Sequence, residues 1–380
     1  MHIAIIGAGV AGAVIARLLN EVGCASTIYE QAPQLARVGA GINLAPNSTR
    51  VFQHLGLESE MFRHGLEHEE KLNRDFDTGR LTYRVDTKGL ARLYGAPFLT
   101  IHRGDLQTVL LGGLAPDQLR LGKALERLEP RGPVTRLHFA DGSSADADIV
   151  IGADGVNSRT RHMLVGEEPA PYSGDVAYRA IYPRARLPGV ELPDCTKWWA
   201  DDGRYMLVYF ISGARDQIYF VGGGPEREWG SDSYAPMAVP VSRVKDAFAG
   251  FHPEVQRVID QADAVSRWAI REREPESVWS RGGVVLVGDA CHPMTPYMGQ
   301  GAGMAVEDAA ILVRCLLHAG LDKPQDAFRL YELNRQARTA RVQMESKART
   351  WMRYTMDHEW LFGPDVLTDP LVEEPTDVPA

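Results

Sequence analysis

The first thirty residues contain two apolar runs of strand length, separated by a segment whose apolar residues have helical spacing. Residues 2–6 (HIAII) form an apolar run of strand length that leads into a glycine-rich turn. Residues 11–23 (AGAVIARLLNEVG) place apolar side chains at intervals of three and four and end at a glycine, which is a typical helix stop. Residues 25–30 (ASTIYE) predict a second strand that ends in an acidic residue. The pattern therefore predicts a strand, a tight turn, a helix and a second strand.

Two later apolar runs predict further strands of the same sheet. Residues 149–153 lead into Asp154, and residues 284–288 lead into Asp289. A helix is predicted next, at about 302–316, after a stretch rich in glycine. Uninterrupted apolar strands that alternate with helices are typical of parallel sheets with both faces covered.

Residues 172–278 have a different pattern of apolar and polar positions. Segments such as VAYRAIYP, YMLVYFIS and QIYFVGG are rich in aromatic and β-branched residues and alternate in polarity, which is typical of an antiparallel sheet. Because side chains alternate between the faces of a strand, Tyr205, Leu207 and Tyr209 are expected to share one face. A long charged helix is predicted further on, at about 324–354.

These patterns predict an α/β fold. It comprises a Rossmann-like nucleotide-binding domain, an inserted antiparallel β-sheet lobe that covers the reactive end of the nucleotide, and a long C-terminal helix. The predicted parts are the nucleotide-binding domain at 1–73, 97–171 and 279–320, the lobe at 74–96 and 172–278, a C-terminal helical segment at 321–362 and a loose tail at 363–380.

The glycine-rich turn predicts a dinucleotide site. In the pattern G-x-G-x-x-G, Gly7 allows the tight turn, Gly9 lets the backbone approach a pyrophosphate, and Gly12 lets the helix pack closely on the strand. Glu30 follows at the distance expected of an acceptor for a ribose hydroxyl. A secretory signal would need a positively charged start, and only His2 precedes the apolar run.

Composition narrows the function further. The formal charge of −9 over 380 residues, with no basic stripe, argues against a nucleic-acid partner, and no apolar run approaches the length of a membrane span. The four cysteines are far apart without a C-x-x-C pair, which favours a reducing cytoplasm and predicts no metal site.

Four motifs in order resemble one enzyme family. GAGVAG with Glu30, HRGDLQ with Arg103, GADGVNSRTR and GDACHPMTPYMGQGAGMAVEDA resemble the single-component FAD-dependent aromatic monooxygenases, which include para-hydroxybenzoate and salicylate hydroxylases. Within that family, RVGAGINLAPN, DCTKWWADDGRYMLVYF and GDACHPM look most like the 6-hydroxynicotinate 3-monooxygenase branch.

The resemblance implies a cofactor and a reaction. FAD would be bound tightly and non-covalently in the Rossmann-like FAD-binding domain, and NADH or NADPH would bind only transiently. Oxygen would add to reduced flavin as a C4a-hydroperoxide and be transferred to a phenolic or hydroxypyridine carboxylic ring, with or without loss of the carboxylate. The implied FAD shell comprises Gly7, Gly9, Gly12, Glu30, Gln31, Arg37, Asn43, Arg103, Leu125, Asp154, Asp289 and Ala302.

The resemblance also implies the residues around the substrate. Tyr209 and Asn43 would be the catalytic residues, with Tyr209 relaying a proton or orienting the ring. The substrate-binding residues would be Tyr205, Cys195, Leu207 and Tyr297.

This chain departs from the hydroxynicotinate branch in its charges. Asn43, Tyr205 and Tyr297 stand where that branch carries histidines, so positive charge for a carboxylate would have to come from Arg179 or Lys197.

Some alternatives stay open at this level. A salicylate or hydroxybenzoate hydroxylase, a flavin dehydrogenase or oxidase, and a flavin-binding sensor without turnover all fit the fold. His292 is either a packing residue or a base. The expected partners are a small aromatic substrate, O2 and NAD(P)H, without nucleic acid or membrane, for a cytoplasmic monomer or homodimer.

Overall fold

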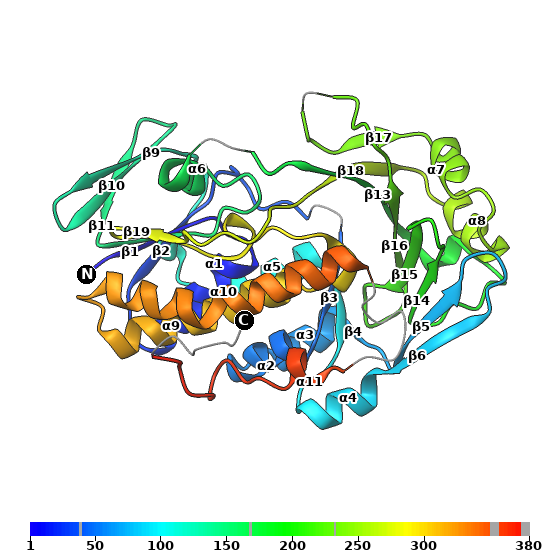
Figure 1. The fold of residues 1–380 in the computed structure, drawn as a ribbon, viewed down its shortest axis with the longest axis horizontal. Helices are drawn as coiled ribbons and strands as arrows, with labels where there is room; N and C mark the ends of the chain where they lie inside the picture. Colours follow the sequence, from blue (N-terminus) through cyan, green and yellow to red (C-terminus); the bar gives the residue numbers. More distant parts are fainter. Residues whose placement is uncertain (38–39, 167–168, 232, 350–356, 374–380) are drawn as a thin grey trace, which may run out of the picture.

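Two large sheets stand at opposite ends of the molecule, and most of the helices lie beside the first (Figure 1). This computed structural model describes residues 1–37, 40–166, 169–231, 233–349 and 357–373. The parallel sheet, the lobe of antiparallel strands and the long C-terminal helix confirm the predicted fold class.

The first sheet has six strands and is parallel except at one edge. Strand β1 lies between β12 and β2, so the glycine-rich turn leaves the sheet near its middle. The apolar runs predicted at 149–153 and 284–288 form β12 and β20, slightly shortened. In order across the sheet, the strands are β19 (Ser280–Arg281), β20 (Val284–Leu286), β12 (Ile149–Gly152), β1 (Ile3–Ile6), β2 (Ser26–Tyr29) and β8 (Leu119–Arg120).

Helices pack beside this sheet. Helix α1 contacts both α5 and α9, and α10 runs alongside α9 (Figure 1). The predicted helices at 302–316 and 324–354 correspond to α9 and α10; positions 350–354 lie outside the described residues. The helices of this part are α1 (Val10–Glu21), α2 (Pro46–His54), α3 (Glu58–His64), α5 (Arg103–Leu111), α6 (Arg159–Val165), α9 (Gly301–Ala319), α10 (Pro324–Ala348) and α11 (Glu359–Phe362).

The second sheet has eight strands and forms the lobe. All neighbours are antiparallel except β14 and β5, which run parallel. In order they are β17 (Met237–Val239), β18 (Val265–Arg271), β13 (Tyr172–Pro183), β16 (Gln217–Pro225), β15 (Tyr205–Phe210), β14 (Cys195–Trp199), β5 (Glu70–Asp75) and β6 (Leu81–Asp86).

Shorter elements complete the chain. A small sheet of β3 and β7 with β4 lies between the two large sheets, and β9, β10 and β11 form a meander at the far end of the first domain (Figure 1). Their bounds are β3 (Gly41–Leu44), β4 (Leu66–Glu67), β7 (Leu99–His102), β9 (Leu125–Arg131), β10 (Val134–Phe139), β11 (Ser144–Ala147), α4 (Thr87–Tyr94), α7 (Val241–Ala247) and α8 (Pro253–Asp260).

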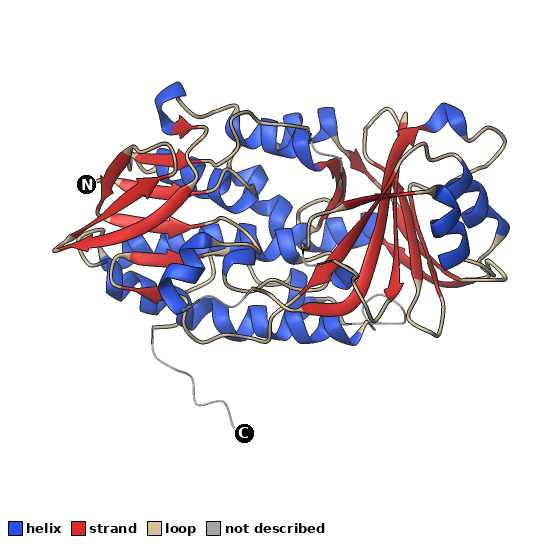
Figure 2. Ribbon diagram, turned by 90° about the horizontal axis from the view of Figure 1, so that it is seen from above, coloured by secondary structure: helices blue, strands red, loops and turns tan. Residues whose placement is uncertain are grey.

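The two faces of the lobe sheet pack against different parts of the molecule. Helices cover its outer face at the end of the molecule (Figure 2), where Met206, Val208 and Phe210 join an apolar core. Tyr178 and Tyr182 belong to that outer core, and the Tyr182 hydroxyl donates to the carbonyl of Val258 at 2.8 Å. Tyr205 and Tyr209 lie on the opposite face, as the alternation predicted.

Two predicted boundaries differ from the structure. Strand β5 begins at Glu70, before the lobe segment expected from residue 74, because its polar sequence EKLNRD carries no apolar signal of a strand. Residues 363–373 were expected to be a loose tail, but they pack on the first domain. Val366 is buried, and Arg314 donates to its carbonyl at 2.7 Å. The remaining tail positions, 374–380, lie outside the described residues.

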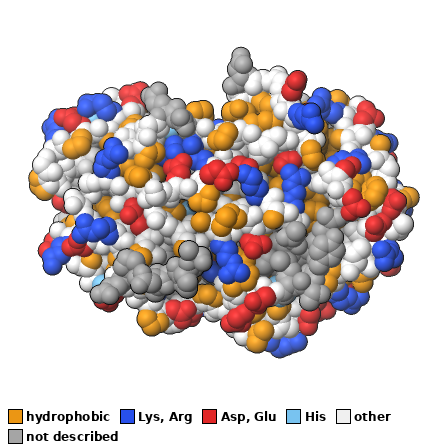
Figure 3. Space-filling model, viewed as in Figure 1, with side chains coloured by type: hydrophobic (Ala, Val, Ile, Leu, Met, Phe, Trp, Pro, Cys, Tyr) orange, Lys and Arg blue, Asp and Glu red, His pale blue; other side chains and the backbone are white. Residues whose placement is uncertain are grey.

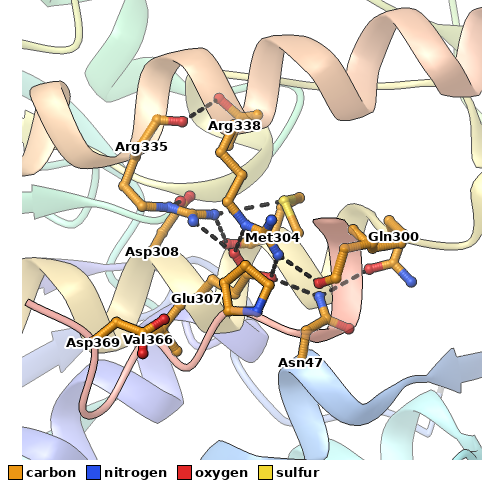
Figure 4. Close-up of polar contacts among 12 residues, drawn as sticks. Asn47, Gln300, Met304, Glu307, Asp308, Arg335, Arg338, Val366 and Asp369 are labelled. Atoms are coloured by element: carbon orange, nitrogen blue, oxygen red, sulfur yellow. Dashed lines mark hydrogen bonds and ion pairs between the residues drawn. The ribbon is translucent and has the colours of Figure 1, made fainter. Parts of the chain in front are cut away.

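A buried network of charges joins helices α2, α9 and α10 (Figure 4). Glu307 and Asp308 are neighbours on α9, and both are fully buried. Arg335 of α10 donates to Glu307 at 2.6 Å and to Asp308 at 2.8 Å. Arg338 donates to Glu307 at 2.6 Å, and Asn47 of α2 donates to the same carboxylate at 2.7 Å. The network therefore fixes α2 and α10 against α9.

The second carboxylate of this network reaches the sheet. Asp308 accepts the backbone N–H of Gly288 at 2.9 Å and contacts His292 Nε2 at 2.5 Å. Burial acts to raise the pKa of Asp308, but His292 and Arg335 outweigh it and lower this pKa to about 2. The carboxylate thus stays ionised and holds the turn that follows β20.

The surface carries charges of both signs. On the face in Figure 3, Lys and Arg side chains are interspersed with Asp and Glu. Among the described residues, no helix is both long and apolar enough to cross a membrane.

We expect Arg335→Met to destabilise the protein strongly. The substitution leaves two buried carboxylates short of a counter-charge, and removing one partner of a buried ion pair costs about 3–5 kcal/mol. Urea unfolding of the flavin-loaded enzyme measures the change. The matched control is Arg329→Met, which breaks an exposed pair on the same helix and should change the free energy of unfolding by about 0.5 kcal/mol or less. Equal effects of the two substitutions would contradict the account.

Candidate active site

A cavity of about 350 Å³ lies between the two large sheets. Its first part is formed by turns that leave the parallel sheet, including Gly9 after β1 and Asp289 after β20. Its second part is formed by the inner face of the lobe sheet. Open parallel sheets bind ligands at the carboxyl ends of their strands, and this cavity lies there.

The glycine-rich turn has the geometry of a dinucleotide site. Gly7 has φ of +104°, and a Cβ there would lie 2.6 Å from the carbonyl oxygen of Ala153. A Cβ at Gly12 would collide with the carbonyl oxygen of Gly7, so α1 packs directly on the turn. A Cβ at Gly9 would meet nothing within 4 Å, because this backbone faces the cavity. The close contacts at Gly7 and Gly12 agree with the tight turn and the helix packing predicted for them, while the contact of Gly9 with a pyrophosphate stays a prediction.

A second helix N-terminus faces the same cavity. Gly299, Gly301 and Ala302 line it where the 19-residue helix α9 begins, and Gly299 has φ of +68°. Within the described part of the chain no side chain caps this terminus, so its first N–H groups can meet an anionic group. Reduced flavin carries negative charge, which a helix N-terminus stabilises.

Two charged residues on the side of the parallel sheet face the cavity without partners among the described residues. Asp289 is exposed in the turn after β20, and its carboxylate makes no hydrogen bond there. The exposed Arg103 begins α5, and its guanidinium is free of ion pairs. The buried Oδ1 of Asn43 also has no hydrogen-bond partner. These unmet groups fit the hydroxyls and pyrophosphate of a dinucleotide.

The other predicted FAD residues lie outside this cavity. Glu30 accepts the backbone N–H of Ala8 at 2.8 Å, which joins the end of β2 to the glycine-rich turn. Asp154 accepts the hydroxyl and N–H of Thr160 and holds its own loop. Arg37 forms a two-point ion pair with Asp105.

The other two predicted FAD residues, Gln31 and Leu125, make no contact among the described residues that indicates a role in binding the cofactor. Gln31 is exposed, and Leu125 is buried in β9. The contacts of these five residues with FAD stay predictions.

The lobe wall is built around Tyr209. This residue is buried, and its ring packs edge-on against Tyr219 at 5.1 Å between centroids. A Cβ at Gly41 of β3 would lie 2.6 Å from the Tyr209 hydroxyl, so glycine is needed where the small sheet meets the lobe. Burial raises the pKa of Tyr209 well above its usual value, and the neighbouring Tyr219 and Cys195 raise it further. Tyr209 is therefore protonated at neutral pH.

The other predicted substrate residues line the same wall. Tyr205 packs edge-on against Tyr297 at 5.4 Å between centroids, which joins the lobe to the turn before α9. Burial raises the pKa of both phenols, so both are neutral. Cys195 and Leu207 also line the cavity, and burial raises the pKa of the Cys195 thiol. The structure thus brings all six residues predicted to be catalytic or substrate-binding, including Asn43, to one cavity.

Sequence reasoning missed part of this wall. Lys71 and Asn73 of β5 and Tyr219 of β16 line the cavity. The alternation of QIYFVGG could have revealed Tyr219, whereas the polar stretch around Lys71 holds no signal that separates it from a surface segment. Among the described residues, the cavity is therefore lined by four cationic residues, Lys71, Arg103, Arg179 and Lys197, and by one acid, Asp289.

His292 does not line the cavity. It is buried against Asp308, and its ring packs 5.3 Å from that of Trp279. This geometry supports a packing role and not that of a base. Cys291, His292 and Asp308 also lie close enough to share a metal ion. However, Asp308 is already bonded to Arg335, Gly288 and His292, so the group fits a structural network.

Comparisons with known proteins agree with this geometry. The FAD binding domain family matches residues 1–346. A 6-hydroxynicotinate 3-monooxygenase of Bordetella bronchiseptica is 46% identical over 376 residues, covering 98% of this chain and 97% of that protein. A 3-amino-4-hydroxybenzoate 2-monooxygenase of Streptomyces cremeus is 39% identical over 350 residues, covering 91% and 86%. The structure of Klebsiella pneumoniae HpxO complexed with FAD and uric acid has a TM-score of 0.81 at 27% identity, covering 95% and 90%.

A dinucleotide cradle that opens on a ring-lined cavity defines the class of flavin-dependent aromatic monooxygenases. The chain belongs to the FAD binding domain family, and it is an FAD-dependent aromatic monooxygenase. The resemblance drawn from its motifs is thereby confirmed.

We expect Asp289→Ala to lower the FAD content of the purified protein. The substitution removes the free acceptor at the end of β20, and a lost hydrogen bond of a charged group costs about 1.5–3 kcal/mol, or roughly 10–100-fold in affinity. Absorbance at the flavin band against protein concentration measures it. The control Asp117→Ala, an exposed acid away from the cavity, should keep the wild-type ratio. A yellow Asp289→Ala protein with unchanged FAD affinity would remove this residue from the site.

Proposed function

We propose that the enzyme hydroxylates an anionic hydroxypyridine or hydroxybenzoate ring, with 6-hydroxynicotinate as the first candidate, and uses NAD(P)H and O2 as co-substrates. The observation that carries the proposal is the inner wall of the lobe, where tyrosines and cations line one cavity with the FAD cradle. The 46% identity to a 6-hydroxynicotinate 3-monooxygenase along nearly the whole chain supports the choice of substrate.

The chain's own residues would orient and activate the ring. Bound FAD supplies the oxygen-transfer chemistry, while the protein holds the ring and keeps water out. A phenol-like hydroxyl must lose its proton to make the ring electron-rich. Because the raised pKa of Tyr209 keeps its own proton in place, Tyr209 would donate a hydrogen bond to the ring oxygen or pass a proton on, and would not act as a free base. Asn43 neighbours this hydroxyl and would fix its direction.

Positive charge in the cavity would select the substrate. Asn43, Tyr205 and Tyr297 are neutral, so they contribute hydrogen bonds without charge. Lys197 lies over the Trp199 ring at 3.7 Å, and Arg179 lies over the Trp268 ring at 4.7 Å. Arg179 and Lys197, the two residues expected to supply positive charge for a carboxylate, therefore both face the cavity.

The proposal also covers the cellular compartment, the oligomeric state and the partners of the enzyme. The four cysteines are free, which supports a reducing cytoplasm. We infer a monomer or homodimer without a nucleic-acid or membrane partner. If the protein were a flavin dehydrogenase or oxidase, it would oxidise the substrate without inserting an oxygen atom from O2. If it were a flavin-binding sensor, it would show no turnover.

The proposed function predicts a pattern of turnover across ring acids. In a panel of hydroxybenzoates and hydroxypyridine carboxylates, 6-hydroxynicotinate should accelerate NAD(P)H oxidation with equal O2 uptake and one ¹⁸O atom from ¹⁸O2 in the product. Mass spectrometry also shows whether the carboxylate is lost. A salicylate-type hydroxylase would instead prefer a benzoate. Oxidised product without ¹⁸O would establish a dehydrogenase or oxidase and refute hydroxylation.

Tyr209→Phe should slow hydroxylation and leave the FAD content unchanged. Loss of one hydrogen bond to a group that gains charge corresponds to roughly 10–100-fold in turnover number. Steady-state O2 uptake measures it. Tyr182→Phe is the matched control, because its hydroxyl lies on the outer face of the same sheet. If both variants turn over at the wild-type rate, Tyr209 has no part in the reaction.

A further inference from the structure

Lys71 lies at a defined place on the inner face of the lobe. Strands β14 and β5 run parallel, with Thr196 opposite Leu72, so Lys71 lies beside Cys195. Cys195 is in turn opposite Tyr209 in β15. Because neighbouring strands are about 4.8 Å apart, the Cα atoms of Lys71 and Tyr209 lie about 10 Å apart across this row, and both residues line the cavity.

The Lys71 amine has no ionic partner among the described residues. It lies 5.2 Å from the centroid of the Phe98 ring, and no hydrogen bond or salt bridge reaches it. Burial lowers the pKa of Lys71, whereas the Cys195 thiol acts to raise it. A buried ammonium without a counter-charge is costly, and one that faces a cavity can regain that cost from a bound anion.

The other two cations of the lobe wall each lie over a tryptophan ring. Lys197 packs over the rings of Trp199 and Tyr205 at 3.7 and 4.7 Å. Arg179 stacks over the Trp268 ring at 4.7 Å, and its buried Nε has no hydrogen-bond partner among the described residues. Lys71 has the longest of these ring contacts, and its partner is a phenylalanine, which attracts a cation less than tryptophan does. Among the cavity-lining strands, that of Lys71 is also the furthest from Arg179.

We propose that the Lys71 ammonium binds an anionic oxygen of the aromatic substrate and is a specificity-determining residue of this enzyme. The proposal rests on the proposed function. Two substituents share the required chemistry: the carboxylate, and the ring hydroxyl once it has lost its proton. In either case the ion pair fixes one end of the ring at β5 and leaves the other towards the flavin cradle.

The test compares ligand binding to wild-type enzyme and Lys71→Met, both loaded with FAD. The probes are 6-hydroxynicotinate, its carboxamide, nicotinate without the ring hydroxyl, and nicotinamide without either group. Perturbation of the flavin absorbance gives each Kd. We expect Lys71→Met to weaken 6-hydroxynicotinate by about 10–100-fold, the range for a hydrogen bond to a charged group, and to leave nicotinamide unchanged.

The analogues identify the group that Lys71 holds. If it is the carboxylate, the loss persists for nicotinate and disappears for the carboxamide; if it is the ring oxygen, the reverse holds. Lys71→Arg should restore most of the affinity. Lys88→Met, which removes an exposed lysine paired with Glu69, is the matched control and should bind as wild type.

Two results overturn the proposal. One is a Lys71→Met enzyme that binds 6-hydroxynicotinate as tightly as wild type, and the other is an equal loss for all four probes. Lys71→Gln carries the same comparison if Lys71→Met fails to fold. When wild-type enzyme turns over another acid of the panel faster, that acid and its amide and deoxy analogues replace the four probes. Failure of the wild type to hydroxylate any acid refutes the proposed function itself, whereas normal turnover with indifferent Lys71 variants refutes only this inference.

Discussion

Two neighbouring carboxylates buried in one helix hold the cofactor cradle together. Glu307 ties α9 to α2 and α10, while Asp308 fixes the backbone of Gly288 at the end of β20. Arg335 pairs with both, and Arg338 adds a second positive charge at Glu307, which lets both carboxylates remain ionised in a fully buried place. The same helix begins at the cavity, so its N-terminus and the turn that carries Asp289 are positioned by one set of contacts.

The lobe and the small sheet meet closely at a glycine beside the cavity. Gly41 lets β3 approach the Tyr209 hydroxyl, and the contact of Tyr205 with Tyr297 closes the wall beside α9. The lobe thereby presents rings and cations to the cavity, while its outer face packs as an ordinary apolar core. Because the two faces of one sheet have different surroundings, its tyrosines divide into those that line the cavity and those that pack in the outer core.

Much of this arrangement was predictable from sequence, since it depends on local signals. The glycine turn, the buried strands and the alternation around Tyr209 each follow from residue type and spacing. The parts that were missed depend on contacts distant in the chain. Lys71 faces the cavity only because β5 pairs with β14 across more than a hundred residues, and residues 363–373 are held by Arg314 and Asn334. The partner choices of Asp154 and Arg37 likewise depend on tertiary geometry.

The central claim is that one cavity holds both the flavin ring and an anionic aromatic substrate. A crystal structure of the enzyme with FAD and 6-hydroxynicotinate tests it most directly. The account predicts the flavin ring between the start of α9 and the inner face of the lobe, with the substrate ring beside Tyr209 and one of its anionic oxygens against a lobe-wall cation. A flavin ring that faces open solvent away from Tyr209, or a substrate bound outside the cavity, would contradict it.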